Sequence, residues 1–408
     1  MNKRIVIFHH GLIGSGGGER ITLEEEKYFK GYECNPAILT FYYNPDIFNG
    51  NYNPNVVNIS PKRFSKHLLI KICQKIKNLR KEISKIKPDH IIAVGEEGCV
   101  YVFFSTLFTK FKYSVHIHQT IFWDIKTYRN IWDTSPFLLG RYSPIFKNVY
   151  NEVRNSTFGH RESLPDEPPK MGFKKRLLSE ALGFITFKAV SKAKNIFVLS
   201  NKMGWEIEKM YKRKSIVLKG AYPESIKYYE PKINIKDYYN IYNKKVLLSL
   251  CRLEPKKRVD LIINAFEILS KRRKDVVLII GGTGSAEEEL KTLVKNLKIE
   301  DSVIFTGFID ENMLYDYYYY CDVFVSADHA DYDITTYTAI GFNKKTVWAI
   351  ENEVSDDLIN SGNVFPANPN ALDFSKAIES ALDSKINGNF NPRRYSWESY
   401  FSDIYRYL

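Results

Sequence analysis

Residues 245–258 read Lys245-Val-Leu-Leu-Ser-Leu-Cys-Arg-Leu-Glu-Pro-Lys-Lys-Arg258, an apolar run that gives way to a cationic turn. The run 245–251 predicts a strand that is buried on both faces. Residues 258–271 then have the spacing of a helix, and 276–280 form a second apolar run. Alternating strands and helices are typical of a parallel sheet covered by helices on both faces, so this stretch predicts an α/β domain.

The same alternation extends over the whole chain. In the first half we expect strands at 4–8, 36–41, 89–94, 112–117 and 195–199, and helices at 19–30, 64–87, 174–194 and 202–211. In the second half we expect further strands at 302–306, 323–326 and 346–350, and helices at 286–297, 370–382 and 396–408. The predicted fold is α/β, with two Rossmann-like, doubly wound domains facing a cleft. We place the first domain at 1–220, the second at 221–395, and at 396–408 a C-terminal helix that can pack back on the first.

Length and composition agree with this division. A chain of 408 residues is too long for one ordinary domain and suits two of about 200 residues. The five cysteines are scattered and show no metal-ligand spacing, which is typical of a reducing compartment. No signal peptide and no apolar run of about 20 residues is present, so we expect a cytoplasmic protein, or one that is peripheral to a membrane.

The positive charge is concentrated in the first half. Residues 1–220 hold 36 Lys and Arg against 19 Asp and Glu, whereas the remainder holds 23 against 28. The first half should therefore face an anionic acceptor, an anionic membrane or nucleic acid. Helix 64–87 contributes to this charge with a face of lysines, among them Lys71 and Lys75, opposite an apolar face that begins at Leu69. Helix 174–194 is also basic; each helix is either an ordinary solvated surface helix or a membrane contact.

A glycine-rich turn, Gly11-Leu-Ile-Gly-Ser-Gly-Gly-Gly-Glu-Arg20, lies between the first strand and the first helix. Glycines let a backbone approach a ligand closely, and the helix start offers free N–H groups to phosphate. No Gly-Lys-Ser/Thr follows, and no acidic residue ends the next strand, so the turn is neither a P-loop nor a dinucleotide fingerprint. The alternative interpretation is a flexible turn without a ligand.

Cations follow the strand 245–251 at the edge of the sheet where open α/β sheets bind ligands. Arg252, Lys257 and Arg258 there lie near a helix start, where positive charge opposes the helix dipole. An anionic ligand would relieve that conflict; without a ligand, the cluster is simply solvated. The turn Gly281-Gly-Thr-Gly284 repeats the phosphate-binding pattern, although tight turns also use glycine for packing alone.

His118 follows another predicted strand of the first half, in the segment His116-Ile-His118. At a sheet edge it could donate a hydrogen bond or polarise a reacting oxygen. The alternative is a packed histidine without a role in chemistry. No combination of His, Cys and Asp has the spacing of a zinc site, so we expect no metal.

Together these residues resemble the retaining, nucleotide-sugar-dependent glycosyltransferases of the GT-B fold, family 4. The resemblance is strongest from Lys245 to about Ile350. The motifs that carry it are Leu248-Ser-Leu-Cys-Arg-Leu-Glu-Pro-Lys-Lys257, Leu278-Ile-Ile-Gly-Gly-Thr-Gly284, Val303-Ile-Phe-Thr-Gly-Phe308 and Cys321-Asp-Val-Phe-Val-Ser326. In the first half, Gly16-Gly-Gly-Glu-Arg20 and His118-Gln-Thr-Ile-Phe-Trp-Asp124 are similar to family elements.

The resemblance implies a role for each matching position. Arg252 and Lys257 would hold the donor diphosphate, and with His118, which would lie by the donor sugar and acceptor, they form the expected catalytic set. The glycine turn would let the first domain approach the donor phosphates, and the Thr306–Phe308 turn would pack against the base. The implied donor-binding residues are Gly16, Gly17, Arg252, Lys257, Gly282, Thr306, Gly307, Phe308, Asp333, Ile334, Thr335 and Thr338. The nucleotide sugar is then a co-substrate, and no cofactor or metal is implied.

The chain departs from the family at its two donor-gripping glutamates. Ala330 and Thr338 stand at those positions, and Asp333 replaces a residue that is usually glycine. Asp328, Asp331 or Asp333 would have to supply a displaced carboxylate. We expect a helix to start at Ile334, with backbone N–H groups available to the phosphates.

From the resemblance we expect an enzyme, a hexosyltransferase of glycan biosynthesis that moves a hexose from a nucleotide sugar to an anionic or lipid-linked saccharide acceptor, with retention and without a metal. Loss of both glutamates leaves open a non-catalytic relative used for binding or scaffolding. A DNA-directed glucosyltransferase is a weaker alternative, since nothing but the basic first half suggests nucleic acid. A sugar-nucleotide epimerase of the same fold is another.

Overall fold

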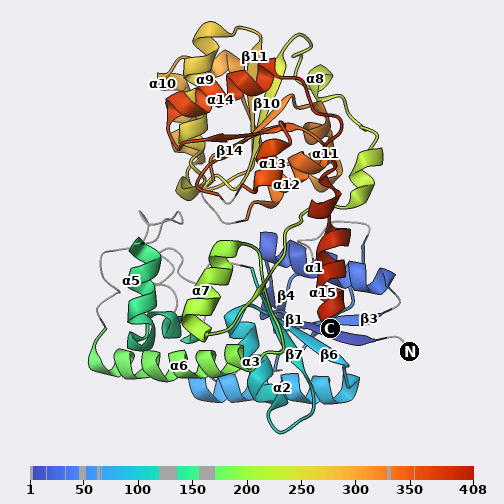
Figure 1. Cartoon of the computed structure of the whole chain (residues 1–408), viewed down its shortest axis with the longest axis vertical. Coiled ribbons are helices and arrows are strands. Elements are labelled where there is room, and N and C mark those ends of the chain that lie inside the picture. The colour runs from blue at the N-terminus through green and yellow to red at the C-terminus, as the bar shows by residue number, and fades with distance from the viewer. Residues whose placement is uncertain are drawn as a thin grey trace. The chain divides into compact units, whose positions relative to one another are not determined.

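The structure is a computed structural model of the chain. It describes residues 3–14, 16–32, 34–45, 52–61, 65, 67–118, 136–155, 171–328, 332–352 and 354–408. The chain divides into two compact units, unit 1 with residues Met1–Leu218 and Phe401–Leu408, and unit 2 with residues Lys219–Tyr400. We had placed these divisions after residues 220 and 395. The predicted α/β class and its two parallel sheets are confirmed (Figure 1).

Unit 1 is built on a seven-stranded parallel sheet of order β5-β3-β1-β6-β7-β8-β9. Its strands are β1 (Arg4–Phe8), β3 (Asn35–Thr40), β5 (Val56–Asn58), β6 (His90–Val94), β7 (Tyr113–Ile117), β8 (Ile196–Val198) and β9 (Ile216–Val217), with a small separate pair β2 (Gly11–Leu12) and β4 (Tyr42–Tyr43). Its helices are α1 (Gly17–Gly31), α2 (Leu68–Ile86), α3 (Gly95–Thr106), α5 (Lys147–Asn155), α6 (Phe173–Ser191) and α7 (Asn201–Tyr211), and 3₁₀ turns span Pro136–Tyr142 and Pro144–Phe146.

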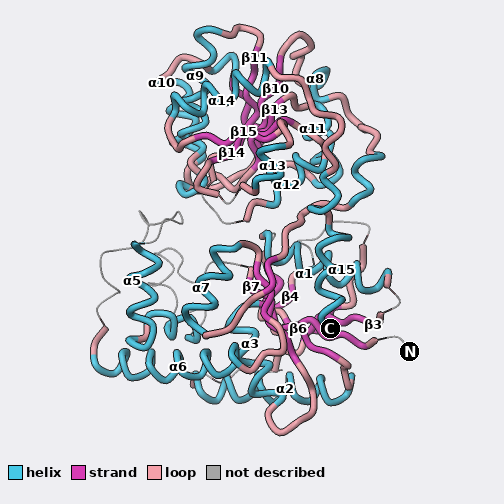
Figure 2. The backbone as a smooth tube through the Cα atoms, viewed as in Figure 1, coloured by secondary structure: helices cyan, strands magenta, loops and turns pink. Residues whose placement is uncertain are grey.

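Unit 2 has a six-stranded parallel sheet of order β12-β11-β10-β13-β14-β15. Its strands are β10 (Lys245–Leu250), β11 (Val276–Gly281), β12 (Val303–Gly307), β13 (Val323–Ser326), β14 (Lys345–Ala349) and β15 (Val364–Ala367). Its helices are α8 (Ile235–Tyr238), α9 (Val259–Arg272), α10 (Glu287–Asn296), α11 (Glu311–Tyr320), α12 (Ile334–Gly341), α13 (Asp356–Asn360) and α14 (Ala371–Asp383). In Figure 2 the strands of each unit lie together, with helices around them.

The apolar run that opens unit 2 is buried on both faces, as predicted. Leu247 belongs to the core beneath α9, α10 and α14, whereas its neighbours Val246 and Leu248 belong to the core beneath α8, α11 and α12. Successive side chains of a strand point to opposite faces, so a strand between two helical layers is apolar at most positions, here with Ser249 as a buried polar exception. The strand order reverses between β10 and β13, which makes the carboxyl ends of these two strands the topological switch point.

The last helix, α15 (Trp397–Tyr407), ends in unit 1. Phe401 is fully buried, and its ring centroid lies 5.4 Å from that of Tyr28 and 6.3 Å from that of Phe29 on α1. The C-terminal residues therefore complete the core of the first domain.

Two details of α2 differ from the sequence pattern. Leu69, expected in the apolar face, is 75% exposed, and Lys75, expected in the solvated face, is 4% exposed. The Lys75 ammonium lies 2.8 Å from Nε2 of His10 and 4.9 Å from the ring centroids of Phe41 and Tyr42. The aromatic faces and the accepting nitrogen of His10 stabilise the buried ammonium group of Lys75. The periodicity of α2 alone does not predict that this lysine is buried. Of the helices described, none combines the length and apolar character of a membrane span.

Candidate functional site

The switch point of unit 2 brings Lys257 and Asp328 together. Lys257 lies in the loop after β10 and Asp328 directly after β13, and the two strands are neighbours in the sheet. Their side chains form an ion pair that is 19% exposed at Lys257 and 6% at Asp328. Burial lowers the pKa of Lys257, but Asp328 and Asp333 more than offset it, so the pKa is raised and the lysine is charged. The predicted lysine therefore lies at the expected edge with a carboxylate as partner.

The other two cations of this loop, Arg252 and Arg258, differ in exposure and in partners. Arg252 is exposed and forms no ion pair with a described residue, so the structure does not bring it together with Lys257 on a shared partner. Arg258, which we had not assigned to the donor, donates from Nε to the carbonyl of Ala327 at 2.8 Å and pairs with Glu351. Arg258 therefore anchors the loop that carries Lys257 to the carboxyl end of β13.

Asp333 is the N-cap residue of α12. Its carboxylate accepts hydrogen bonds from the hydroxyls of Ser326 at 2.7 Å, Thr335 at 2.6 Å and Thr336 at 2.5 Å. It also accepts from the backbone N–H groups of Thr335 at 3.1 Å and Thr336 at 3.4 Å. The helix starts at Ile334 as predicted. The expectation that its N–H groups are available to phosphate is wrong for Thr335 and Thr336, because Asp333 already caps them.

Thr338, which stands at one of the two glutamate positions, is 4% exposed. Its hydroxyl donates to the carbonyl of Ile334 at 2.8 Å, within the same helix. Ala330 and Asp331 lie outside the described residues. Donor contact by Thr338 stays a prediction, and its hydroxyl already donates within the helix.

The glycine turn after β11 is packed against the loop after β10. A Cβ atom at Gly282, where φ is +123°, would lie 1.9 Å from the carbonyl oxygen of Cys251, and one at Gly284 would lie 2.3 Å from that of Leu253. The Leu253 N–H also donates to the Thr283 carbonyl at 2.9 Å. These glycines are required by a close approach of two backbone segments, which is the packing alternative raised from the sequence. Donor contact by Gly282 stays a prediction.

The turn after β12 presents an aromatic ring. The Thr306 hydroxyl donates to the Gly307 carbonyl at 3.0 Å, and Gly307 takes a φ of +68° that favours glycine. Phe308, the next residue, is 70% exposed. Its face is accessible for stacking, as the expected contact with a base requires.

In unit 1, the structure places the glycine turn and His118 side by side. Gly16 is the N-cap of α1, and Gly17 is its first residue. A Cβ atom at Gly18 would lie 3.3 Å from Nδ1 of His118, the residue that follows β7. The start of α1 already carries a carboxylate, because a Cβ at Gly16 would lie 2.6 Å from Oε2 of Glu19. The rest of the predicted element, residues 119–124, lies outside the described residues.

His118 is kept neutral by its surroundings. Burial, and then the neighbouring His116 and His9, hold the pKa of His118 well below its usual range. The Gly18 backbone lies close enough to raise the pKa in part, but neither ring nitrogen of His118 meets hydrogen-bond geometry with a described residue. A neutral imidazole has one donor and one acceptor nitrogen, so His118 can still donate to an incoming oxygen.

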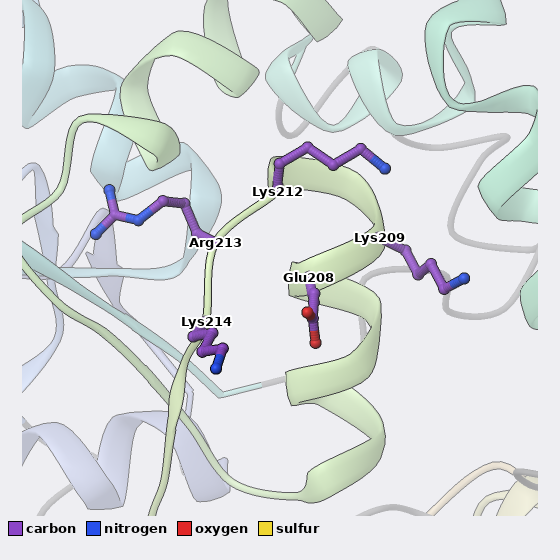
Figure 3. A pocket seen from close by; sticks show the side chains of 5 residues that line it. All are labelled: Glu208, Lys209, Lys212, Arg213 and Lys214. Atoms are coloured by element: carbon purple, nitrogen blue, oxygen red, sulfur yellow. The ribbon is translucent and has the colours of Figure 1, made fainter.

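A hollow in unit 1 lies on a different surface. Glu208, Lys209, Lys212, Arg213 and Lys214 surround a hollow of about 430 Å³ at the end of α7 (Figure 3). In the view, Lys209 and Arg213 point away from each other. Arg213 donates to the carbonyls of Ser191 and, at 3.0 Å, Ala193, and Lys209 pairs with Glu152 at 2.8 Å. The hollow precedes β9 and so lies at the amino edge of the sheet, opposite His118.

The pattern at the switch point can be compared with known proteins. Residues 232–335 match the family described as glycosyl transferases group 1. This segment holds Arg252, Lys257, the β11 and β12 turns, and Asp333. The expected resemblance to group 1 glycosyltransferases is confirmed over this segment.

Several curated relatives match part of the chain, including two synthases. The alpha-monoglucosyldiacylglycerol synthase of Streptococcus pneumoniae is 35% identical over 114 residues, which are 28% of this chain and 25% of the relative. The mannosylfructose-phosphate synthase of Agrobacterium fabrum is 35% identical over 115 residues, 26% of this chain and 25% of the relative. The matched part thus spans about a quarter of each relative.

The likeness of fold extends over the whole chain. The crystal structure of Anabaena HepE in complex with UDP and glucose has a TM-score of 0.69 to this chain, with 13% identity and 99% of each chain covered. At this identity the likeness shows the fold, which is that of the GT-B glycosyltransferases.

Proposed function

We propose that this chain, whose residues 232–335 carry the glycosyl transferases group 1 segment, transfers a hexose from a nucleotide sugar to a saccharide acceptor. The observation that carries the proposal is the position of Lys257 at the switch point of unit 2, inside the family segment. Open α/β sheets bind their ligands at the carboxyl edge of such a point. The solved structure of similar fold with UDP and glucose bound supports a nucleotide-sugar donor.

The side chains have defined tasks in this reaction. The bond between the anomeric carbon and the phosphate oxygen breaks, so negative charge grows on the departing nucleoside diphosphate. Lys257 and the exposed Arg252 supply fixed positive charge to those oxygens, and electrostatic stabilisation of this kind is often the largest contribution to catalysis. His118 donates a hydrogen bond to the donor sugar or the acceptor. Retention at the anomeric carbon and metal independence are part of the proposal, since two cations can do the work that a metal ion does elsewhere.

The binding of a donor tests the proposal directly. UDP, GDP and their glucose and mannose derivatives are titrated into the full chain by calorimetry, after a thermal-shift screen. We expect one nucleotide to bind, and we expect Arg252→Ala combined with Lys257→Ala to weaken that binding at least about tenfold with an unchanged circular dichroism spectrum. Binding of no nucleotide or nucleotide sugar at all would overturn the proposal.

A second function, binding or scaffolding without catalysis, is favoured by one observation. Asp328 already pairs with Lys257, and Asp333 already accepts hydrogen bonds from the N–H groups at the start of α12. These are the groups that would otherwise bind the phosphates of a donor. Release of nucleoside diphosphate in the presence of an acceptor decides between the two, because a scaffold does not turn over.

The acceptor and the membrane contact belong to the proposal as well. We propose an anionic or lipid-linked acceptor and peripheral attachment to an anionic membrane. On α6, Phe173, Leu177 and Phe184 are 82%, 60% and 54% exposed, next to Lys174 and Lys175. Exposed apolar side chains among lysines are typical of helices that lie on anionic lipid.

Vesicle co-sedimentation tests the membrane contact. We expect the chain to bind vesicles that contain a third phosphatidylglycerol and not vesicles of phosphatidylcholine alone. Phe173→Ser with Leu177→Ser should reduce the bound fraction. Equal binding of the variant and the original chain would contradict the membrane contact on α6.

A further inference from the structure

Three polar side chains form a line through unit 1, from α1 to the carboxyl end of β7. Glu25 lies on α1, His116 on β7, and His118 directly after that strand. Oε1 of Glu25 is 3.8 Å from Nδ1 of His116, and both side chains are fully buried. The rings of His116 and His118 meet edge to face, with centroids 4.2 Å apart and planes at 87°. The line therefore connects the core to the proposed substrate edge.

The periodicities of the two elements produce this line. The core-facing residues of α1 are Ile21, Thr22, Glu25, Glu26 and Phe29, which follow the helical repeat. His116 and His118 are two positions apart along an extended chain, so they share one face of the sheet. Glu25 is a carboxyl group at a position where an amphipathic helix normally carries an apolar residue.

Within the described part of the chain, the buried carboxyl group of Glu25 lacks the hydrogen bonds that a residue kept only for the stability of the fold would be expected to have. Neither of its carboxyl oxygens forms a hydrogen bond with a described residue, and the same holds for both ring nitrogens of His118. A buried polar group without a hydrogen bond destabilises the folded state, and such groups in native proteins call for a functional explanation. Two of them on one line, ending at the proposed substrate edge, point to a shared task.

The neighbouring residue, Glu26, shows that a carboxyl group buried on α1 can still form hydrogen bonds. Glu26 is fully buried, like Glu25. It accepts hydrogen bonds from the Tyr52 hydroxyl and, at 3.3 Å, from the Asn55 N–H. Glu25 differs because it faces His116.

We propose that Glu25 is a positioning residue for His118 and acts through His116. The proposal rests on the proposed function, in which His118 contacts substrate. The carboxyl group of Glu25 selects the tautomer of His116 by attracting its Nδ1 proton. His116 then fixes the orientation of the His118 ring through the edge-to-face contact, so that one ring nitrogen of His118 points as a donor beside the start of α1.

The local charges agree with this arrangement. The ionisable groups that lower the pKa of His118 are His116 on β7 and His9 after β1, and Glu25 on α1 faces His116. Burial holds the pKa of His9 at about 4, so this neighbour is neutral at pH 7. His118 is thus held as a neutral imidazole whose donor and acceptor nitrogens depend on its neighbours.

The test reads the histidine rings directly. The full chain is labelled with ¹⁵N at its histidines, and long-range proton–nitrogen spectra record the tautomer of His118, assigned with His118→Gln. We expect Glu25→Gln and His116→Phe to change the ring ¹⁵N shifts of His118, and the matched Glu26→Gln to leave them unchanged. Unchanged shifts in both Glu25→Gln and His116→Phe would overturn the proposal, and so would equal changes in Glu25→Gln and Glu26→Gln. If Glu25→Gln does not fold, His116→Phe alone decides.

Turnover provides the second measurement. We expect Glu25→Gln to lower kcat roughly tenfold with the KM for the nucleotide sugar within about twofold, and Glu26→Gln to leave kcat unchanged. If the original chain shows no turnover, the proposed function fails, while the ring spectra still decide whether Glu25 positions His118. If the chain turns over and Glu25→Gln has the original kcat, the positioning role is overturned and the function stands.

Discussion

At the scale of single residues, two of the helix starts that the sequence assigned to phosphate, those of α1 and α12, carry a carboxylate of the chain itself. Asp333 caps α12 through the N–H groups of Thr335 and Thr336, and the Glu19 carboxylate lies over Gly16 at the start of α1. A carboxylate at a helix start offsets the dipole as a phosphate would. Under the proposed function, a phosphate at either helix start would have to displace the carboxylate, whereas Arg252 and Phe308 of unit 2 are exposed.

Replacing Asp333 by glycine tests whether the cap excludes phosphate. We expect Asp333→Gly to lower the free energy of unfolding by up to about 2 kcal/mol, because the start of α12 loses its cap. We also expect tighter binding of UDP by calorimetry, because two N–H groups become available to an anion. Asp310→Gly is the control, since Asp310 caps α11 through the Asn312 N–H at 2.8 Å; it should lose stability without a gain in UDP affinity. Weaker UDP binding by Asp333→Gly would show that the carboxylate belongs to the donor site.

His90 on β6 makes stability depend on pH. Burial, with smaller contributions from Lys194, Lys3 and Lys112, lowers its pKa to about 4, below the usual value of 6.5. Above pH 6.5 the residue is neutral in both states and its contribution is fully present. As the pH falls from 6.5 towards 4 the unfolded chain takes up a proton and the folded chain does not, so stability is lost at about 1.4 kcal/mol per pH unit.

Urea unfolding at pH 7 and pH 5 measures this loss. His90→Gln, which keeps a polar partner for the Ser114 hydroxyl, should reduce the difference between the two pH values by about 2 kcal/mol. Burial also lowers the pKa values of His9 and His10, so these two residues make stability fall with pH in the same way. The variant keeps both, and part of the pH difference therefore remains. An equal pH difference in the variant and the original chain would contradict the role of His90.

At the scale of elements, the loops after β10 and β11 form one packed unit. Gly282 combines a φ of +123° with a position where a Cβ would overlap the Cys251 carbonyl at 1.9 Å. The loop with Arg252 and Lys257 is held against this turn, so Gly282 helps to position the loop that carries the two cations.

Gly282→Ala should therefore lower the free energy of unfolding by about 3 kcal/mol or more, from backbone strain and overlap together. Gly31→Ala is the matched control, because nothing lies within 4 Å of its Cβ position in the last turn of α1. Alanine is the better helix former by up to about 1 kcal/mol, so the control should be neutral or stabilising. Chemical denaturation of both variants measures the difference; a Gly282→Ala variant as stable as the original chain would contradict the packed unit.

The sequence predicted most elements of both sheets, because apolar runs and helical spacing are local signals. It did not predict α3, whose residues Cys99–Val102 are all buried. A helix buried on all sides has no amphipathic stripe to detect. The position of Lys257 at the sheet edge followed from the strand before it. Its pairing with Asp328 joins two residues that are 71 positions apart along the chain, so it has no local signal. The same holds for Glu25 and His116, which meet only when α1 packs on β7.

At the scale of the whole molecule, the chain's last residues belong to its first unit. Phe401 and Tyr405 pack against aromatic residues of α1, and Lys194 donates to the carbonyl of Tyr407 at 2.8 Å. The C-terminal segment therefore stabilises unit 1, although the segment directly before it, Lys219–Tyr400, forms unit 2. Two cores that share one chain can lose stability separately, since each buries its own apolar surface.

Phe401→Ala should consequently destabilise unit 1 and not unit 2. Removing a fully buried phenylalanine leaves a cavity and typically costs about 3–5 kcal/mol. Hydrogen exchange followed by mass spectrometry should show faster exchange in β1 and β7 of this variant, with β10 and β11 unchanged. Phe374→Ala is the converse, because Phe374 is equally buried in the core beneath α9 and α14 of unit 2. If either variant accelerates exchange in both sheets to the same extent, the two units unfold together, and the C-terminal helix then couples the cores and does more than complete the first.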